Sequence, residues 1–109
     1  MKDGQDYFFV NVDYSLLKVM YADIIWIEGL KDYVKIHLKT SSKPLMVRLT
    51  VKAVEDELPQ SKFVRIHRSY IVSINKIESY SNELVWLGKS ELPISRMYRH
   101  EVEKVLKTK

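Results

Sequence analysis

The sequence contains no cysteine, only three glycines and three prolines, and no long apolar run. Without cysteine the chain has no disulfide framework, no thiolate nucleophile and no cysteine-based zinc site. Its apolar runs, such as residues 24–27, are far shorter than the roughly 18 residues that a membrane helix needs. The first residues have no apolar core of a signal peptide. We therefore expect a cytoplasmic protein without a membrane segment.

Catalytic and metal-binding motifs are also missing. The three histidines, His37, His67 and His100, are never at the spacing of metal ligands. The glycines are too scattered to form a phosphate-cradling loop. Ser69 lies near His67 but has no third partner for nucleophilic catalysis. The sequence therefore predicts no enzymatic activity, no metal and no cofactor.

The positive charge is unevenly placed along a chain whose 109 residues are enough for one domain. The net charge is +4. Residues 1–61 carry eight Lys and Arg against nine Asp and Glu, whereas residues 62–109 carry ten against five, including four of the five arginines. The planar guanidinium has a fixed donor geometry that suits phosphates and base edges. The second part therefore favours a polyanionic partner, with a solvated basic face as the alternative.

Short β-prone segments dominate the chain. Strict alternation over residues 33–38 predicts a strand with one buried face. Residues 29–32, which include one glycine, are predicted as the turn before it. The predicted strands cover residues 7–12, 15–20, 24–28, 33–38, 45–49, 63–66, 70–72, 76–81, 83–87 and 90–93. Their number and short connections predict a mostly β domain of antiparallel sheets.

Two helices are predicted among these strands. Thr50 is a suitable N-cap for a short middle helix over residues 51–58. The acidic residues 55–57 are predicted to lie on its outer side, away from any polyanion. Ser95 is a suitable N-cap for a C-terminal helix that continues to about Lys107.

Three basic clusters lie where predicted strands end or the last helix begins. An ordinary turn would use Gly, Asn, Asp or Pro, whereas these positions offer long hydrogen-bond donors. Arg96 and Arg99 are three residues apart, so they share one helix face near an N-terminus that attracts phosphate. The clusters are Lys31, Asp32 and Tyr33 with Lys35; Arg65, His67, Arg68 and Ser69; and Arg96 with Arg99. Together the three clusters favour a nucleic-acid-binding surface over the alternative that each is an ordinary loop whose charges only face solvent.

Two other classes of binding protein stay open. Interleaved Tyr and Arg would suit a single-stranded nucleic-acid binder, although strand propensity accounts for most of the tyrosines. A β-rich protein-interaction module, which docks a partner at exposed sheet edges, is the other alternative. Duplex affinity with strong salt dependence would separate double-stranded DNA binding from both.

Three stretches of the sequence resemble a known family. Residues 63–72, Phe-Val-Arg-Ile-His-Arg-Ser-Tyr-Ile-Val, resemble the central signature of LytTR-type DNA-binding domains of LytR/AlgR-class bacterial transcription regulators. Residues 24–29 followed by 32–37 are similar to the family's first contact loop and next strand. Residues 92–96 are similar to the stretch that leads into its last helix. The resemblance covers about residues 7–106 in the same order.

The resemblance implies an elongated stack of antiparallel β-sheets, with loops rather than a recognition helix entering the major groove of DNA. It implies base contacts from Lys31, Asp32 and Tyr33 in the first loop, Arg68 in the second and Arg96 in the third. It implies phosphate contacts from Lys35, Arg65, His67, Ser69 and Arg99, with a bond inside the turn as the alternative for His67.

The resemblance also implies partners. The expected ligand is double-stranded DNA with paired direct-repeat half-sites, bound by the output domain of a two-component response regulator. A full-length regulator is expected to form a homodimer on DNA and to carry a receiver domain before this one. We expect residues 1–109 to form a single DNA-binding domain, because they leave no room for an α/β receiver.

Overall fold

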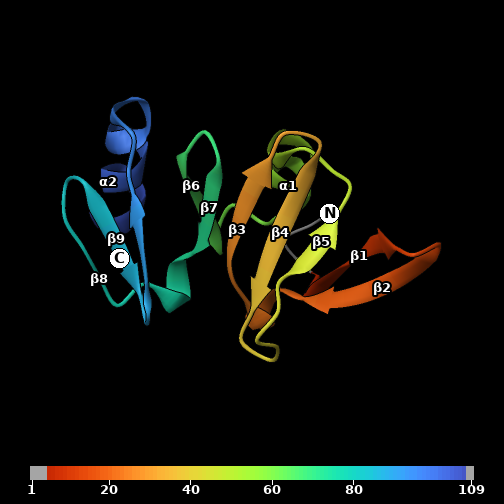
Figure 1. Ribbon diagram of the computed structural model, residues 1–109. Coiled ribbons are helices and arrows are strands. Elements are labelled where there is room, and N and C mark those ends of the chain that lie inside the picture. Colours follow the sequence, from red (N-terminus) through yellow and green to blue (C-terminus); the bar gives the residue numbers. More distant parts are fainter. Residues whose placement is uncertain (1–4, 108–109) are drawn as a thin grey trace.

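A computed structural model describes residues 5–107, so residues 1–4 and 108–109 of the predicted single domain lie outside the described residues. Three antiparallel sheets lie side by side in a body whose principal extents are 40 × 28 × 24 Å (Figure 1). This agrees with the predicted elongated, mostly β architecture. No helix within the described residues is long and apolar enough to cross a membrane.

The first sheet is a hairpin of β1 (Tyr7–Val12) and β2 (Ser15–Met20). Its two-residue turn has positive φ angles at Asp13 and Tyr14, a conformation typical of tight hairpins. Phe8, Val10 and Val19 are buried against the rest of the domain. The 3-10 turn η1 (Tyr21–Asp23) then leads into the central sheet.

The central sheet has five strands in the order β5-β4-β3-β7-β6. A helix, α1, separates β5 from β6 in the chain, and the Thr50 hydroxyl accepts the Ala53 N–H at 3.1 Å, as the predicted N-cap requires. The bounds are β3 (Ile24–Leu30), β4 (Tyr33–Leu38), β5 (Leu45–Val47), α1 (Val51–Glu57), β6 (Phe63–His67) and β7 (Tyr70–Ser73).

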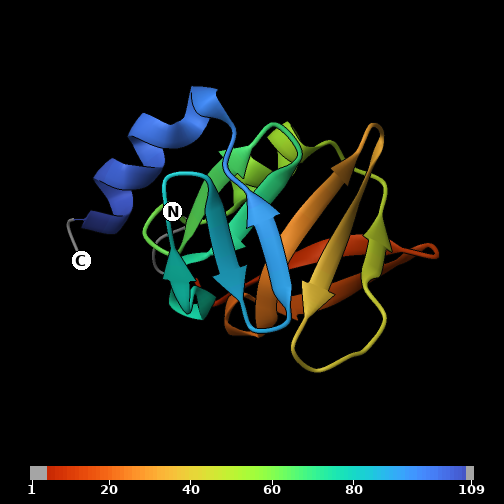
Figure 2. The same cartoon turned by 60° about the vertical axis from the view of Figure 1, so that its left-hand side comes forward.

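The third sheet has three strands in the order β10-β9-β8. A 3-10 turn, η2, precedes it, and a second, η3, leads into the C-terminal helix α2 (Figure 2). The bounds are η2 (Ile74–Lys76), β8 (Ser79–Tyr80), β9 (Leu84–Leu87), β10 (Ser90–Pro93), η3 (Arg96–Tyr98) and α2 (Arg99–Lys107).

The central sheet contributes to two hydrophobic cores because successive strand residues point to opposite faces. Ile71 packs into the core formed with β1, β2 and α1, whereas its neighbour Val72 packs into the core formed with β9, β10 and α2. Val64 and Ile66 of β6 also belong to the second core. Burial on both faces fixes the register of these strands and therefore the positions of their connecting turns.

Several predicted boundaries were wrong. Strand β3 continues through Gly29 to Leu30, so the turn is only two residues long. Glycine suggested a turn, but its role is packing: a Cβ at Gly29 would collide with the side chain of Val51 in α1. Ser95 makes no side-chain cap, because a 3-10 turn precedes α2 and Tyr98 N–H donates to the Ser95 carbonyl instead. Strand β8 spans only two residues, since η2 occupies part of the predicted strand.

Candidate nucleic-acid interface

Two of the basic clusters lie next to each other at one end of the central sheet. Strands β3 and β7 are antiparallel neighbours with Glu28 opposite Tyr70, so the turn after β3 lies beside the turn before β7. The Gly29 N–H donates to the Ser69 carbonyl at 2.7 Å and ties the end of β3 to the β6–β7 turn. Both turns are at the top of Figure 1.

The third cluster reaches the same end through β6. The Ser95 N–H donates to the Ile66 carbonyl at 3.0 Å, which ties the start of η3 to the end of β6. Figure 2 shows the β10–α2 connection and the two turns along the same edge. We call this surface, formed by residues 31–33, 67–69 and 95–99, the basic edge. Clusters that are over 60 positions apart in the chain thus form one surface.

The first turn of the basic edge exposes its side chains. Lys31 has a φ of 65°, in the left-handed region, and Leu30 and Tyr33 pair on either side of it. Lys31, Asp32 and Tyr33 are all exposed. Lys35 lies two residues further along β4, half-buried and opposite Glu28, so it is on the face of the sheet rather than at the tip.

Arg48 is a member of this region that the sequence did not reveal. Its guanidinium carbon lies 5.8 Å from the centre of the Tyr33 ring, within the range of a cation–π contact. Strand β5 pairs with β4 with Val47 opposite Val34, so the residue after Val47 lies beside Tyr33. The sequence signal was weak, because Arg48 is a single arginine in the part of the chain that has no net positive charge.

The second turn is stabilised from within. His67 Nδ1 accepts the Ser69 N–H at 3.1 Å, which is the alternative that the sequence left open for this histidine. Burial, followed by the positive charges of Arg68 and Arg65, lowers the pKa of His67 and favours the neutral ring that this bond needs. Arg68 itself is exposed at the tip of the turn.

Arg65 points into the protein rather than out from it. Its Nη2 donates to the Arg68 carbonyl at 2.6 Å, its Nε to the His67 carbonyl at 3.2 Å, and its Nη1 to Glu55 Oε1 at 2.8 Å. Only 17% of its side chain is exposed. Glu55 keeps 39% of its side chain exposed, as expected for the outer side of α1, but the sequence did not reveal its ion pair with Arg65. The geometry favours a structural role for Arg65 over the phosphate contact expected from the sequence.

The third segment exposes Arg96 and Met97, the latter with 85% of its surface accessible. Arg99, three residues after Arg96, is half-buried, and its Nη2 lies 3.9 Å from Glu83. Its Nε is buried without a hydrogen-bond partner among the described residues. Arg96 is therefore presented to solvent, whereas Arg99 is partly engaged by the third sheet.

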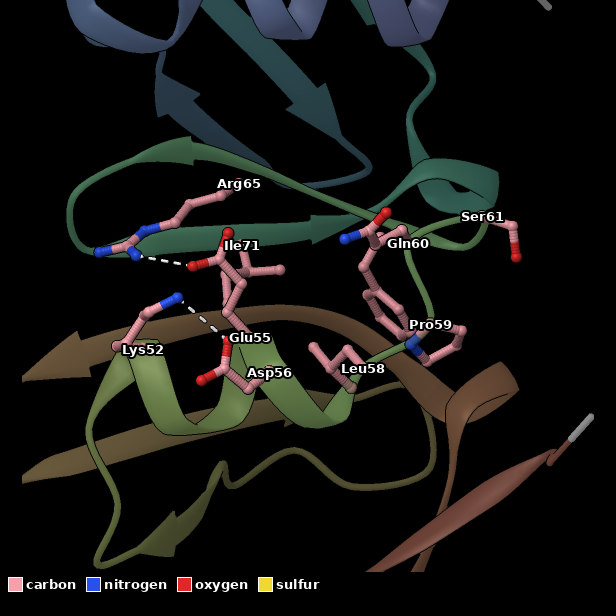
Figure 3. A pocket seen from close by; sticks show the side chains of 10 residues that line it. Lys52, Glu55, Asp56, Leu58, Pro59, Gln60, Ser61, Arg65 and Ile71 are labelled. Atoms are coloured by element: carbon pink, nitrogen blue, oxygen red, sulfur yellow. Dashed lines mark hydrogen bonds and ion pairs between the residues drawn. The ribbon is translucent and has the colours of Figure 1, made fainter. Parts of the chain in front are cut away.

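A groove of about 790 Å³ lies between α1 and the β6–β7 pair (Figure 3). Leu58, Phe63 and Ile71 line its apolar part, and its polar rim includes two ion pairs, Arg65 with Glu55 and Lys52 with Asp56. None of the residues that line the groove belongs to the basic edge, although Arg65 donates to the carbonyls of His67 and Arg68 in it. The groove is therefore not part of the surface that a polyanion would contact.

A β-domain with a basic edge of this kind has the electrostatic footprint typical of nucleic-acid-binding proteins. The family model of the LytTr DNA-binding domain matches residues 14–107. The chain therefore belongs to the LytTr DNA-binding domain family.

Relatives in bacilli agree with this assignment. The chain is 33% identical to the sensory transduction protein LytT of Bacillus subtilis (strain 168) over an alignment of 109 positions, which covers 94% of this chain and 44% of that protein. LytT of Bacillus anthracis is also 33% identical, over 102 residues, covering 88% of this chain and 41% of that protein. The chain thus spans about two fifths of the length of these relatives.

A solved structure confirms the fold. A chain described as the LytTr DNA-binding domain of a methyl-accepting/DNA response regulator from Bacillus cereus superposes with a TM-score of 0.76 at 19% sequence identity. The match covers 94% of this chain and 98% of that one. The predicted mostly β LytTR-like architecture is therefore confirmed.

Proposed function

We propose that this domain binds double-stranded DNA in a sequence-specific manner, as the output module of a bacterial response regulator, and that it has no catalytic role. The observation that carries the proposal is the convergence of three basic connections on one edge. Membership of a DNA-binding family supports it. The 40 Å long axis exceeds one turn of B-DNA, about 34 Å, so one molecule is long enough to reach successive major grooves on one side of the duplex.

Arg68 and Arg96 are the proposed readers of guanine, because both are exposed and a guanidinium can donate two parallel hydrogen bonds to O6 and N7. Lys31, Asp32 and Tyr33 are proposed to read bases from the first turn. The proposed phosphate contacts are Lys35, Ser69, Arg99 and, as an addition from the structure, Arg48.

The whole regulator is the subject of a further part of the proposal. The LytT relatives are more than twice as long as this chain. We propose that such a regulator acts in the cytoplasm, carries a receiver domain before the DNA-binding domain, and binds paired direct repeats as a homodimer.

Selection from a pool of random duplexes tests the proposal. We expect one motif to be enriched, and affinity for it to fall by orders of magnitude between low and physiological salt, because phosphate contacts release counterions. Arg68→Ala and Arg96→Ala should each relax the motif at one or two positions. A pool that shows no enrichment at low salt would contradict sequence-specific binding.

A protein-interaction role is the second candidate, favoured by the outer face of the β1–β2 hairpin. Phe9 and Leu16 there expose 54% and 69% of their surface, and exposed apolar residues that gather on one face can mark interaction sites. A domain that acts only in this way would show no salt-dependent affinity for duplex DNA. The same salt titration therefore separates the two functions.

A further inference from the structure

Arg65 contacts both the second and the third part of the basic edge, and also helix α1. Besides the two turn carbonyls and Glu55 of α1, its guanidinium carbon lies 5.6 Å from the ring centre of Tyr98 in η3. Tyr98 lies between Arg96 and Arg99 in the sequence. One side chain therefore connects the turn that carries Arg68, the segment that carries Arg96, and the helix behind them.

The position of Arg65 in the sheet makes these contacts possible. Strand β6 is an edge strand of the central sheet, and its pairing with β7 shifts in register between Arg65 and His67. Such a bulge redirects a side chain and increases the local twist. Here the side chain of Arg65 lies at the end of the groove next to α1, where Figure 3 shows it directed toward Glu55.

The chemistry of these contacts requires arginine rather than any cation. The planar fork donates through Nε, Nη1 and Nη2 to three separate acceptors at the same time. A lysine ammonium is a single point with no fixed plane, so it cannot reach the same acceptors in one geometry. Glu55 is the only charged acceptor of the three, and it orients the guanidinium through a charge-assisted bond.

We infer that Arg65 is a positioning residue for DNA recognition: it fixes the β6–β7 turn against α1 and η3, and thereby sets the placement of Arg68 relative to Arg96. The inference rests on the proposed function, in which these two arginines read DNA. Arg65 then acts on discrimination between sequences, and it makes no phosphate contact. Glu55 contributes to the same positioning by orienting Arg65, although its negative charge by itself opposes DNA binding.

The first variant to measure is Arg65→Lys, which keeps the positive charge and removes the fork. Affinity for the selected duplex should fall by about tenfold or more, the range that corresponds to one lost base contact. Affinity for random duplex and the slope of log affinity against log salt should stay as in the parent protein. If Arg65 were a phosphate contact, Lys would largely preserve both affinities and Arg65→Ala would reduce the slope by about 0.9.

The second variant is Glu55→Gln, which is milder and keeps the shape of the side chain. Its matched control is Glu57→Gln, an exposed position of the same helix whose carboxylate makes no ion pair with residues 5–107. Both changes remove one negative charge, so electrostatics alone predicts slightly tighter binding to any duplex for both. The inference predicts weaker binding to the selected duplex for Glu55→Gln only, several-fold below the control.

Measurements on the parent protein and on the variants separate a failure of the proposed function from a failure of the inference. A parent protein that fails to discriminate the selected duplex from random duplex overturns the proposed function and the inference with it. A parent that discriminates, together with variants that lose affinity equally on both duplexes, overturns the inference alone. Thermal unfolding of each variant identifies a folding defect. Amide hydrogen exchange at residues 66–69 in the free protein should increase in Arg65→Lys, which loses the guanidinium that donates to the turn, and in Glu55→Gln, which loses the charge that orients it.

Discussion

The two neighbouring turns of the basic edge are built in opposite ways. The first, between β3 and β4, exposes Lys31 and Asp32, and no hydrogen bond of their side chains is present within residues 5–107. The second, between β6 and β7, is fixed from three sides: by His67 from within, by Arg65 from β6 and by Gly29 from the neighbouring strand β3. The two turns therefore differ in how much of their geometry exists before DNA arrives.

This difference suits the two tasks that the proposed DNA-binding surface would perform. A side chain on a preorganised turn loses little freedom on binding and can demand one hydrogen-bond geometry, which is the basis of discrimination. Side chains on an open turn can adapt to the backbone of many sequences and contribute mainly charge. We therefore expect the second turn to set specificity and the first turn to add affinity with weaker selectivity.

Exchanging one arginine and one lysine for alanine tests this division with the largest expected effect. Arg68→Ala should cost about 1–3 kcal/mol on the selected duplex and little on random duplex, because a bidentate base contact is lost. Lys31→Ala should weaken binding to both duplexes, with a smaller loss of selectivity than Arg68→Ala, because its side chain reads bases from a turn that is not held in one geometry. Fluorescence anisotropy titrations of each variant measure its affinity for the selected duplex relative to its affinity for random duplex. Equal selectivity losses in the two variants would contradict the division.

Gly29 ties the end of β3 to the β6–β7 turn, and its substitution should destabilise the fold. A Cβ at this position would collide with Val51, so Gly29→Ala should lower the free energy of unfolding by about 1–3 kcal/mol, the usual cost of overpacking. Urea unfolding followed by tryptophan fluorescence measures it. Gly88→Ala is the matched control: its φ of 65° makes alanine strained, but a Cβ there meets no close neighbour, so about 1 kcal/mol is expected.

The sequence predicted most elements but not how they meet. Alternation over residues 33–38 and the Thr50 cap are local signals, and both elements formed as predicted. The placement of β3 beside β7 rather than beside another strand is a long-range pairing that no local pattern encodes. For the same reason Gly29 was interpreted as a turn residue, since its close partner, Val51, belongs to a helix over 20 positions away.

The candidate site shows the same limit. The residues of the three basic clusters could be listed from the sequence, because they interrupt β-prone runs with long donors. Their division into exposed and inward-pointing groups could not, because it depends on hydrogen-bond partners that the fold supplies: the Glu55 carboxylate, which accepts from Arg65, and the Ser69 N–H, which donates to His67. Arg48 was missed because only the pairing of β4 with β5 brings it to Tyr33.

Acidification should affect the second turn more than the first, because the bond to His67 Nδ1 requires a neutral ring. Burial and the adjacent arginines lower the pKa of His67 in the folded protein. Its contribution to stability is therefore complete above about pH 6.5, the ordinary value, and is lost as pH falls through the lower folded pKa.

The measurement is the free energy of unfolding between pH 7 and pH 5. It should fall less steeply in His67→Gln than in the parent protein, whereas His100→Gln, on the exposed side of α2, should keep the parent slope. His37, whose pKa is lowered by burial with Glu28 opposing, remains in every protein compared and contributes the same background. A slope unchanged by His67→Gln would show that the turn does not depend on the neutral ring.

The smallest expected effect concerns the open side of the edge, where Arg48 lies against Tyr33. Arg48→Ala should reduce the slope of log affinity against log salt by about 0.9, the value for one phosphate contact, on selected and random duplex alike.

Lys43→Ala is the control, because it removes the same charge from an exposed position in the β4–β5 loop, at the opposite end of the sheet. A general effect of net charge would lower the slope equally in both variants, whereas a contact at the basic edge lowers it only in Arg48→Ala. A change in base preference in Arg48→Ala would instead show that this arginine contributes to sequence discrimination. The first turn would then also contain a preorganised part, because Arg48 and Tyr33 hold each other in place.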